Sequence, residues 1–134
     1  MRRLMLLAPL LALSAPAFAE SITGDWKTDD GSAIIRVGPC GKLTCGTIAR
    51  ILDPAAPSQD INNPDQALRN RPLVGTPVLS GFTRAGKDWG GGTVYDPKAG
   101  RSYKSKMALS GEGTLDVTGC IMFLCRTKHW SRVD

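Results

Sequence analysis

The stretch that decides the fold covers Trp89–Tyr103 and reads W-G-G-G-T-V-Y-D-P-K-A-G-R-S-Y. Two strand-like segments flank the turn D-P-K-A-G. In this turn Pro97 fixes φ at about −65°, the Asp96 side chain can cap the turn, and Gly100 tolerates a positive φ. The stretch therefore predicts a β-hairpin. Its glycines at 90–92 would let the first strand bend, or let another backbone or a ligand come close.

Short strands and turns continue the pattern on both sides of this hairpin. Strand-like runs cover residues 22–28, 32–38, 43–52, 77–82, 114–119 and 121–133. The D-G pair at 30–31 is typical of a hairpin turn. Together these runs predict an all-β fold of about eight or nine antiparallel strands, as a small barrel or sandwich. A barrel of about eight strands has room inside for at most one small ligand.

One insertion interrupts the strands. Residues 53–76 contain four prolines and are too many for a plain hairpin loop. Within the insertion, Asn63 suits a helix N-cap, Pro64 suits the first helical position, and Gln66 completes a capping-box-like arrangement. A short helix over 64–70 is predicted, ended by Pro72.

The first 19 residues resemble a secretory signal peptide. Two arginines precede an apolar run over 4–13, and Ala17-Phe18-Ala19 is a small-x-small cleavage site. We expect one domain over 20–134, exported to the bacterial periplasm or secreted; an uncleaved anchor is the alternative. No later apolar run approaches the length of a membrane-spanning helix. Cleavage would also remove Arg2 and Arg3, two of the charges behind the net charge of +5.

The four cysteines form two pairs with the same spacing, Cys40 with Cys45 and Cys120 with Cys125. In an exported chain they predict two disulfides. Three connectivities are possible, and we favour the two local ones because cysteines across a tight loop fall within bridging distance. A zinc site of four thiolates is the alternative, but the spacing does not fit zinc knuckles. We therefore expect no metal and no cofactor.

Positive charge gathers near the C-terminus. The basic residues of this region are Lys104, Lys106, Arg126, Lys128 and Arg132. Because neither interleaved aromatics nor a nucleic-acid motif accompany them, we interpret them as a solvated face and expect no nucleic-acid partner.

Two sets of motifs indicate which barrel this is. Gly24-Asp25-Trp26 and the late Arg132 resemble the lipocalin and calycin signature, in which an arginine packs across the indole of a first-strand G-x-W. A longer resemblance covers nearly all of 20–134. The segments C-G-K-L-T-C-G-T-I, D-I-N-N-P-D-Q-A-L-R-N-R-P-L-V-G, the Trp89–Tyr103 stretch and L-C-R-T-K-H-W-S-R-V are similar to the family called domain of unknown function 2147. That resemblance implies an exported bacterial protein with a compact lipocalin-like barrel, and it brings no established activity.

Two groups of side chains are candidates for a ligand site. Polar residues of the insertion would form a rim over the barrel mouth, with an arginine binding a carboxylate or phosphate; alternatively they only pin the insertion as a lid. Aromatic residues would line a cavity; alternatively they fill the core. The candidates are Asp60, Asn63, Arg69, Arg71, Trp89, Tyr95, Tyr103 and Trp130. Trp26 and Arg132 are predicted to be structural.

No catalytic motif is recognised. His129 is the single histidine and lacks a partner of defined spacing. A carboxylate pair such as Asp60 with Asp96 could support hydrolysis, but nothing in the spacing singles it out. The expected function is binding of a small apolar or amphipathic ligand. The alternative is an envelope or protein-interaction module, a hydrolase is less favoured, and the sequence leaves the oligomeric state open.

Overall fold

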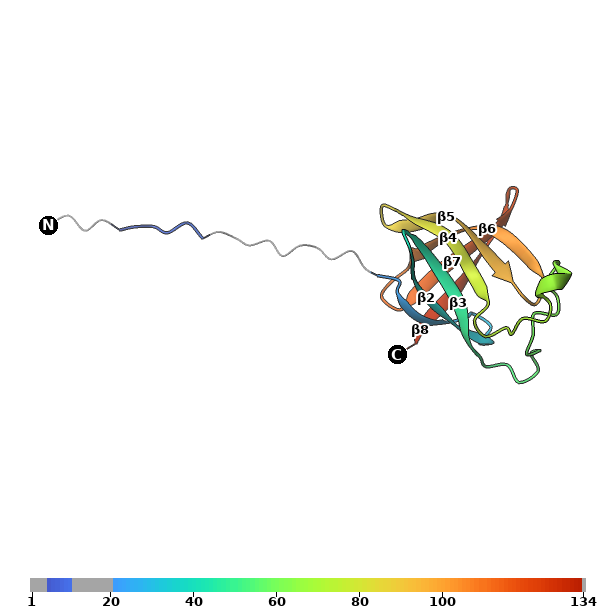
Figure 1. Ribbon diagram of the computed structural model, residues 1–134. Coiled ribbons are helices and arrows are strands. Elements are labelled where there is room, and N and C mark those ends of the chain that lie inside the picture. The colour runs from blue at the N-terminus through green and yellow to red at the C-terminus, as the bar shows by residue number, and fades with distance from the viewer. Residues whose placement is uncertain (1–4, 11–20, 134) are drawn as a thin grey trace.

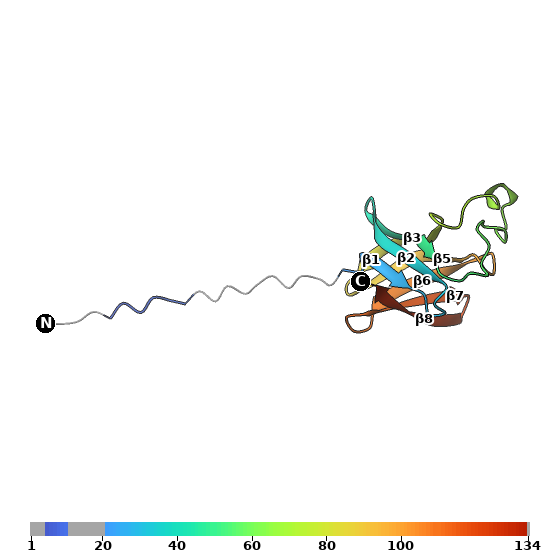
Figure 2. The ribbon, with the colours of Figure 1, turned by 90° about the horizontal axis from the view of Figure 1, so that it is seen from below.

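The computed structural model describes residues 5–10 and 21–133, and residues 24–133 form a closed antiparallel barrel (Figures 1 and 2). Consecutive strands pair, and the last pairs with the first. The strands are β1 (Gly24–Lys27), β2 (Ala33–Cys40), β3 (Leu43–Ile51), β4 (Pro77–Ala85), β5 (Asp88–Asp96), β6 (Arg101–Leu109), β7 (Thr114–Ile121) and β8 (Leu124–Val133). The predicted all-β barrel is confirmed. The proposed cleavage site at 17–19 lies outside the described residues.

The Trp89–Tyr103 hairpin forms as predicted, from β5 and β6. The backbone N–H of Lys98 donates to the Asp96 carboxylate at 3.0 Å, and Gly100 has a φ of +63°. The pairing of β5 with β6 shifts register between Trp89 and Gly92. At Gly92 an added Cβ would lie 2.5 Å from the Phe82 ring. The glycines of β5 therefore bend the strand and admit a core side chain.

The two ends of the barrel differ. Loops β2–β3, β4–β5 and β6–β7 lie at one end, together with the segment that precedes β1. Phe82, Met107 and Leu115, all fully buried, lie in the halves of their strands that lead to this end. We call it the closed end. The other loops, including the insertion between β3 and β4, surround the opposite end, which we call the open end.

Arg132 and Trp26 close the barrel at the closed end. The guanidinium of Arg132 lies over the fully buried Trp26 ring, 4.3 Å from its centroid. It donates to the carbonyls of Ser21 at 2.9 Å and Thr23 at 3.2 Å, and the Trp26 indole N–H donates to the Ile22 carbonyl at 2.9 Å. The predicted contact is present, and it ties the entering chain to the last strand.

Both local disulfides are confirmed. Cys40–Cys45 spans the β2–β3 turn with a Cα–Cα distance of 5.9 Å, and Cys120–Cys125 spans the β7–β8 turn at 4.1 Å. No free cysteine is found within the described part of the chain, so the four-thiolate zinc alternative is wrong.

The predicted helix in the insertion is shorter than expected. It is one 3-10 turn, η1 (Gln66–Leu68), and Asp65 caps it by accepting the N–H of Ala67 at 3.0 Å. The prediction of Asn63 as the N-cap was wrong. Asn63 is buried and donates its amide to Asp60, so it serves the interior of the insertion. Across 5–10 and 21–133 no helix is long and apolar enough to span a membrane.

Removing the closing arginine should destabilise the barrel. We expect Arg132→Ala to lower the free energy of unfolding by about 2 kcal/mol, because it loses a cation–π contact and two charged hydrogen bonds. The matched control is Arg36→Ala. Arg36 makes an exposed ion pair with Asp25 at 3.0 Å, which should contribute little to stability because solvent screens it. Urea unfolding of both variants would measure the difference, and equal losses would contradict a closing role for Arg132.

Candidate functional site

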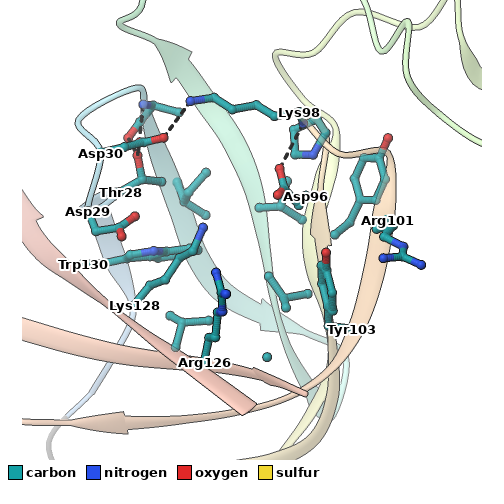
Figure 3. A pocket seen from close by; sticks show the side chains of 18 of the residues that line it. Thr28, Asp29, Asp30, Asp96, Lys98, Arg101, Tyr103, Arg126, Lys128 and Trp130 are labelled. Carbon is teal, nitrogen blue, oxygen red and sulfur yellow. Dashed lines mark hydrogen bonds and ion pairs between the residues drawn. The ribbon is translucent and has the colours of Figure 1, made fainter. Parts of the chain in front are cut away.

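A cavity of about 570 Å³ occupies the open end of the barrel (Figure 3). Its wall follows from strand alternation, because every second residue of a barrel strand faces inward. The deeper wall is apolar and consists of Ala33, Ile35, Ile48, Val78, Val94, Val117 and Trp130. Polar and charged side chains from the turns and from β8 line the rest. The cavity therefore combines an apolar surface with charged groups, which suits an amphipathic molecule.

Strand β8 carries cations into this cavity. Leu124, Arg126, Lys128 and Trp130 share the inner face of β8, and Figure 3 shows Arg126 and Lys128 beside Trp130 in the cavity. Both side chains remain exposed to solvent, as predicted, and they also line the cavity, which was not predicted from the sequence. Lys104 and Lys106 do lie outside, because Tyr103, Ser105 and Met107 occupy the inner face of β6. Counting every second residue back from Trp130 along β8 could have placed Arg126 and Lys128 on the inner face from the sequence.

An ion pair crosses the mouth of the cavity. Lys98 in the β5–β6 turn contacts Asp30 in the β1–β2 turn, with 2.6 Å between Nζ and Oδ2 (Figure 3). Burial opposes the charge of Asp30, but hydrogen bonds from Lys98, Ser32 and Thr28 hold its pKa well below the usual range. The hydrogen bond to Asp30 raises the pKa of Lys98. Both side chains are about half exposed, so this pair contributes at most about 1 kcal/mol and can open readily.

The insertion is fastened to the barrel through Asp60, whose side chain is fully buried. Its carboxylate accepts hydrogen bonds from the Tyr95 hydroxyl at 2.6 Å, the Asn63 amide at 2.8 Å and Arg71 Nε at 3.0 Å. Nearby, the Asn62 amide donates to the carbonyls of Pro97 and Lys98, in the β5–β6 turn. We call residues 52–76 the lid, since these contacts hold them beside the mouth.

The hydrogen bond between Asp60 and Tyr95 moves their pKa values in opposite directions. Burial alone would raise the pKa of Asp60, but the bonds from Tyr95, Asn63 and Arg71 outweigh it and hold the pKa below its usual range. Burial, and then the bond to the Asp60 carboxylate, raise the pKa of Tyr95 to about 12. At neutral pH, Asp60 is therefore an ionised acceptor and Tyr95 a neutral donor.

The predicted site residues separate into three groups. Tyr95, Tyr103 and Trp130 line the cavity. Asp60, Asn63, Arg69 and Arg71 belong to the lid: Arg71 is paired with Asp60, and Arg69 Nε donates to the Asn63 carbonyl at 2.7 Å. These arginines are thus engaged within the lid, and neither lines the cavity. Trp89 lies away from the cavity, in the core, with the Arg84 guanidinium 4.2 Å from its ring centroid.

The residues weighed for catalysis are occupied elsewhere. Nδ1 of His129 lies 2.6 Å from Oδ1 of Asp116, and that oxygen also accepts the Ser110 hydroxyl at 3.0 Å. His129 alternates with Lys128 and Trp130 along β8, so it faces outward. Asp60 is bound within the lid, and Asp96 caps its turn. In the parts of the chain that the structure describes, no three His, Cys, Asp or Glu side chains are arranged to hold a metal ion.

Replacing the buried carboxylate should release the lid. We expect Asp60→Asn to lower the free energy of lid opening by about 2 kcal/mol, since it removes the counter-charge of Arg71 and replaces one of the two acceptor oxygens with an amide donor. Hydrogen exchange of the amides at 58–76 measures this opening, with β7 amides as an internal reference. The matched control is Asp53→Asn in the same insertion, where the side chain accepts a single backbone N–H from Ala55.

The effect of Asp60→Asn on lid opening should depend on pH. Because the folded-state pKa of Asp60 is lowered, the contribution of its carboxylate to lid stability is complete above the unfolded value of about 3.9. That contribution is lost as the pH falls through the folded-state value. The difference in protection between wild type and Asp60→Asn should therefore be largest near neutral pH and shrink towards pH 2. A difference that grows on acidification would contradict the assignment.

Comparison with known proteins agrees with this fold. A solved structure of protein HP1028 from Helicobacter pylori, described as belonging to the lipocalin family, has a TM-score of 0.76 at 20% sequence identity, covering 85% of this chain and 84% of that one. At this identity the likeness shows the fold alone. A search of curated proteins finds no match. Residues 24–132 match the family described as "Uncharacterized protein conserved in bacteria (DUF2147)", and the chain belongs to that family.

Proposed function

We propose that this protein is a periplasmic binding protein that takes one small, partly apolar ligand into the cavity at the open end. The observation that carries the proposal is the cavity itself. Its volume of about 570 Å³ falls within the range of small-molecule sites, about 300–1,000 Å³. Trp130 and the aliphatic residues would contact the apolar part of the ligand, and Tyr95 and Tyr103 add aromatic surface with polar tips. The proposal includes no catalytic step.

The cysteine chemistry supports the proposed compartment. Two disulfides that close short turns are typical of an oxidising environment such as the periplasm. The signal peptide predicted over 1–19 also favours export to the periplasm, and the family is described as conserved in bacteria.

The mouth gives the ligand a route in. The Lys98–Asp30 pair spans it but is half exposed and weak, so a ligand could enter when the pair opens. The lid contacts the β5–β6 turn and Tyr95 through Asn62 and Asp60, beside the mouth. Its two ends bond to Ser32 and Ile48 where it leaves β3 and enters β4. Entry would therefore need no unfolding of a strand.

Filling the cavity tests the proposal. N-phenyl-1-naphthylamine, a neutral apolar fluorophore, should bind the wild type and lose about tenfold or more in affinity in Val94→Trp, whose indole would occupy the cavity. The matched control is Thr93→Trp, one residue earlier on β5 and exposed on the outer face. A fluorescence titration in which Val94→Trp and Thr93→Trp bind as well as wild type would overturn the proposal.

An exposed apolar tip favours a second candidate function, a protein-interaction module. Met122 and Phe123 form the β7–β8 turn and are 86% and 94% exposed, held by the Cys120–Cys125 disulfide. Isolated exposed side chains are ordinary, but adjacent large apolar ones at a rigid tip fit a partner surface.

A photo-crosslinking amino acid at position 123 tests this second candidate in cells. If the tip docks on a protein, a discrete adduct should form from position 123 and be absent from position 112, an equally exposed turn at the closed end. Adding Met122→Ser should weaken that adduct. The same adducts from both positions, or none from either, would exclude docking through the tip.

A further inference from the structure

We infer that the cavity selects an organic anion: a small molecule with an apolar body and one negatively charged group, which Arg126 and Lys128 bind on the inner face of β8. The inference rests on the proposed function and names the chemical class of its ligand. A wall of aliphatic residues alone would favour any apolar molecule. Arg126 and Lys128 add positive charge to the cavity, and a neutral ligand would leave that charge unpaired.

Arg126 and Lys128 have no acidic partner among the described residues. Within residues 5–10 and 21–133 neither makes a hydrogen bond or an ion pair with N···O below 4.0 Å. They are two residues apart on one face of a strand, so their Cα atoms lie about 7 Å apart and their like charges repel. An anion placed between them would relieve that repulsion and accept charge-assisted hydrogen bonds from both.

The carboxylates that share the cavity lie on the turns at its mouth. Asp30 is bound by Lys98, Thr28 and the N–H of Ser32. Asp96 accepts the N–H of Lys98 and pairs in register with Arg101. Asp29 is exposed on the β1–β2 turn. None of the three forms an ion pair with either β8 cation. The β7 residues opposite Arg126 and Lys128 are Gly119 and Val117, which carry no charge.

Gly119 and Tyr103 lie next to Arg126 in the cavity wall. Gly119 is opposite Arg126 in the β7–β8 register, and an added Cβ there would be 3.3 Å from Tyr103 Cβ and 3.4 Å from Val94 Cγ1. The absence of a side chain at 119 thus lets Tyr103 and Val94 pack closely against β7. The Tyr103 hydroxyl has no partner among the described residues and lines the same cavity as the two cations (Figure 3). It can serve as a third donor.

The apolar body would lie on the opposite wall. In a ring of eight strands β4 faces β8, and Ile35, Ile48 and Val78 come from β2, β3 and β4. A charged group at β8 therefore directs the rest of the ligand across the cavity onto these side chains. A bare inorganic anion would leave this wall in water, and a neutral hydrocarbon would leave both cations without a partner.

Two probes with one carbon skeleton test the inference. 1-Anilinonaphthalene-8-sulfonate differs from N-phenyl-1-naphthylamine by a sulfonate, so the ratio of their affinities reports the contribution of the negative charge. We expect the anionic probe to bind wild type about tenfold tighter, and this preference to fall by about tenfold in Arg126→Gln/Lys128→Gln. Affinity for the neutral probe should stay unchanged in that variant, which also verifies that it is folded.

The matched control removes the same charge from the outside of the barrel. Lys104→Gln/Lys106→Gln should keep the full preference, because both lysines face outward on β6 and do not line this cavity. Competition completes the design. Dodecanoate should displace the anionic probe, while inorganic phosphate and dodecanol should be at least about tenfold weaker, because each lacks one of the two required parts.

The outcomes separate this inference from the proposed function. Equal affinity for both probes, or a preference that Lys104→Gln/Lys106→Gln abolishes, would overturn the anion site while leaving a cavity-binding protein intact. Displacement by phosphate as effective as by dodecanoate would show a simple anion site and would also overturn the inference. Loss of both probes in Val94→Trp, with the preference lost only in Arg126→Gln/Lys128→Gln, would support both. Failure of both probes to bind wild type would overturn both.

Discussion

The pairing of β8 with β1 is the constraint on which the rest of the structure depends. It converts a row of hairpins into a ring, so every second residue of every strand must face one shared interior. The Trp26–Arg132 contact secures that ring at one end, where the chain enters beneath the indole. Large side chains fill this end, and the free volume is left at the other. The asymmetry of the barrel thus positions the cavity.

Closure of the ring also explains why charged residues of β8 line the cavity. Arg126 and Lys128 share a strand face with Trp130 and Arg132, and closure leaves that face no other direction. At the closed end, Arg132 is satisfied by an aromatic ring and two carbonyls. Further along β8, no carboxylate or carbonyl in the described part of the chain binds Arg126 or Lys128. One strand therefore carries a structural cation and two cations with unused binding capacity.

Much of the fold could be predicted from local sequence, because its determinants are local. The D-P-K-A-G turn, the two cysteine pairs and the alternation along β6 each depend on residues within a few positions of one another. The site was less predictable. Crowded polar residues in the insertion suggested a ligand rim, yet Arg71 and Asn63 are used to satisfy Asp60. The cations that do line the cavity come from β8, whose inner face follows from alternation only once Trp130 is known to point inward.

The side chains that anchor the middle of the lid to the barrel are few. Asp60 reaches Tyr95 on β5, and Asn62 reaches the next turn, where Gly100 has no Cβ and lets the backbone of Asn62 approach closely. Both anchors fall within three residues. The end of the lid is held too, because Leu73 is buried and the backbone of 75–76 bonds to Ile48 on β3. Residues 54–57, by contrast, make only local bonds, so a change of length there would reshape the entrance at little cost to the strands.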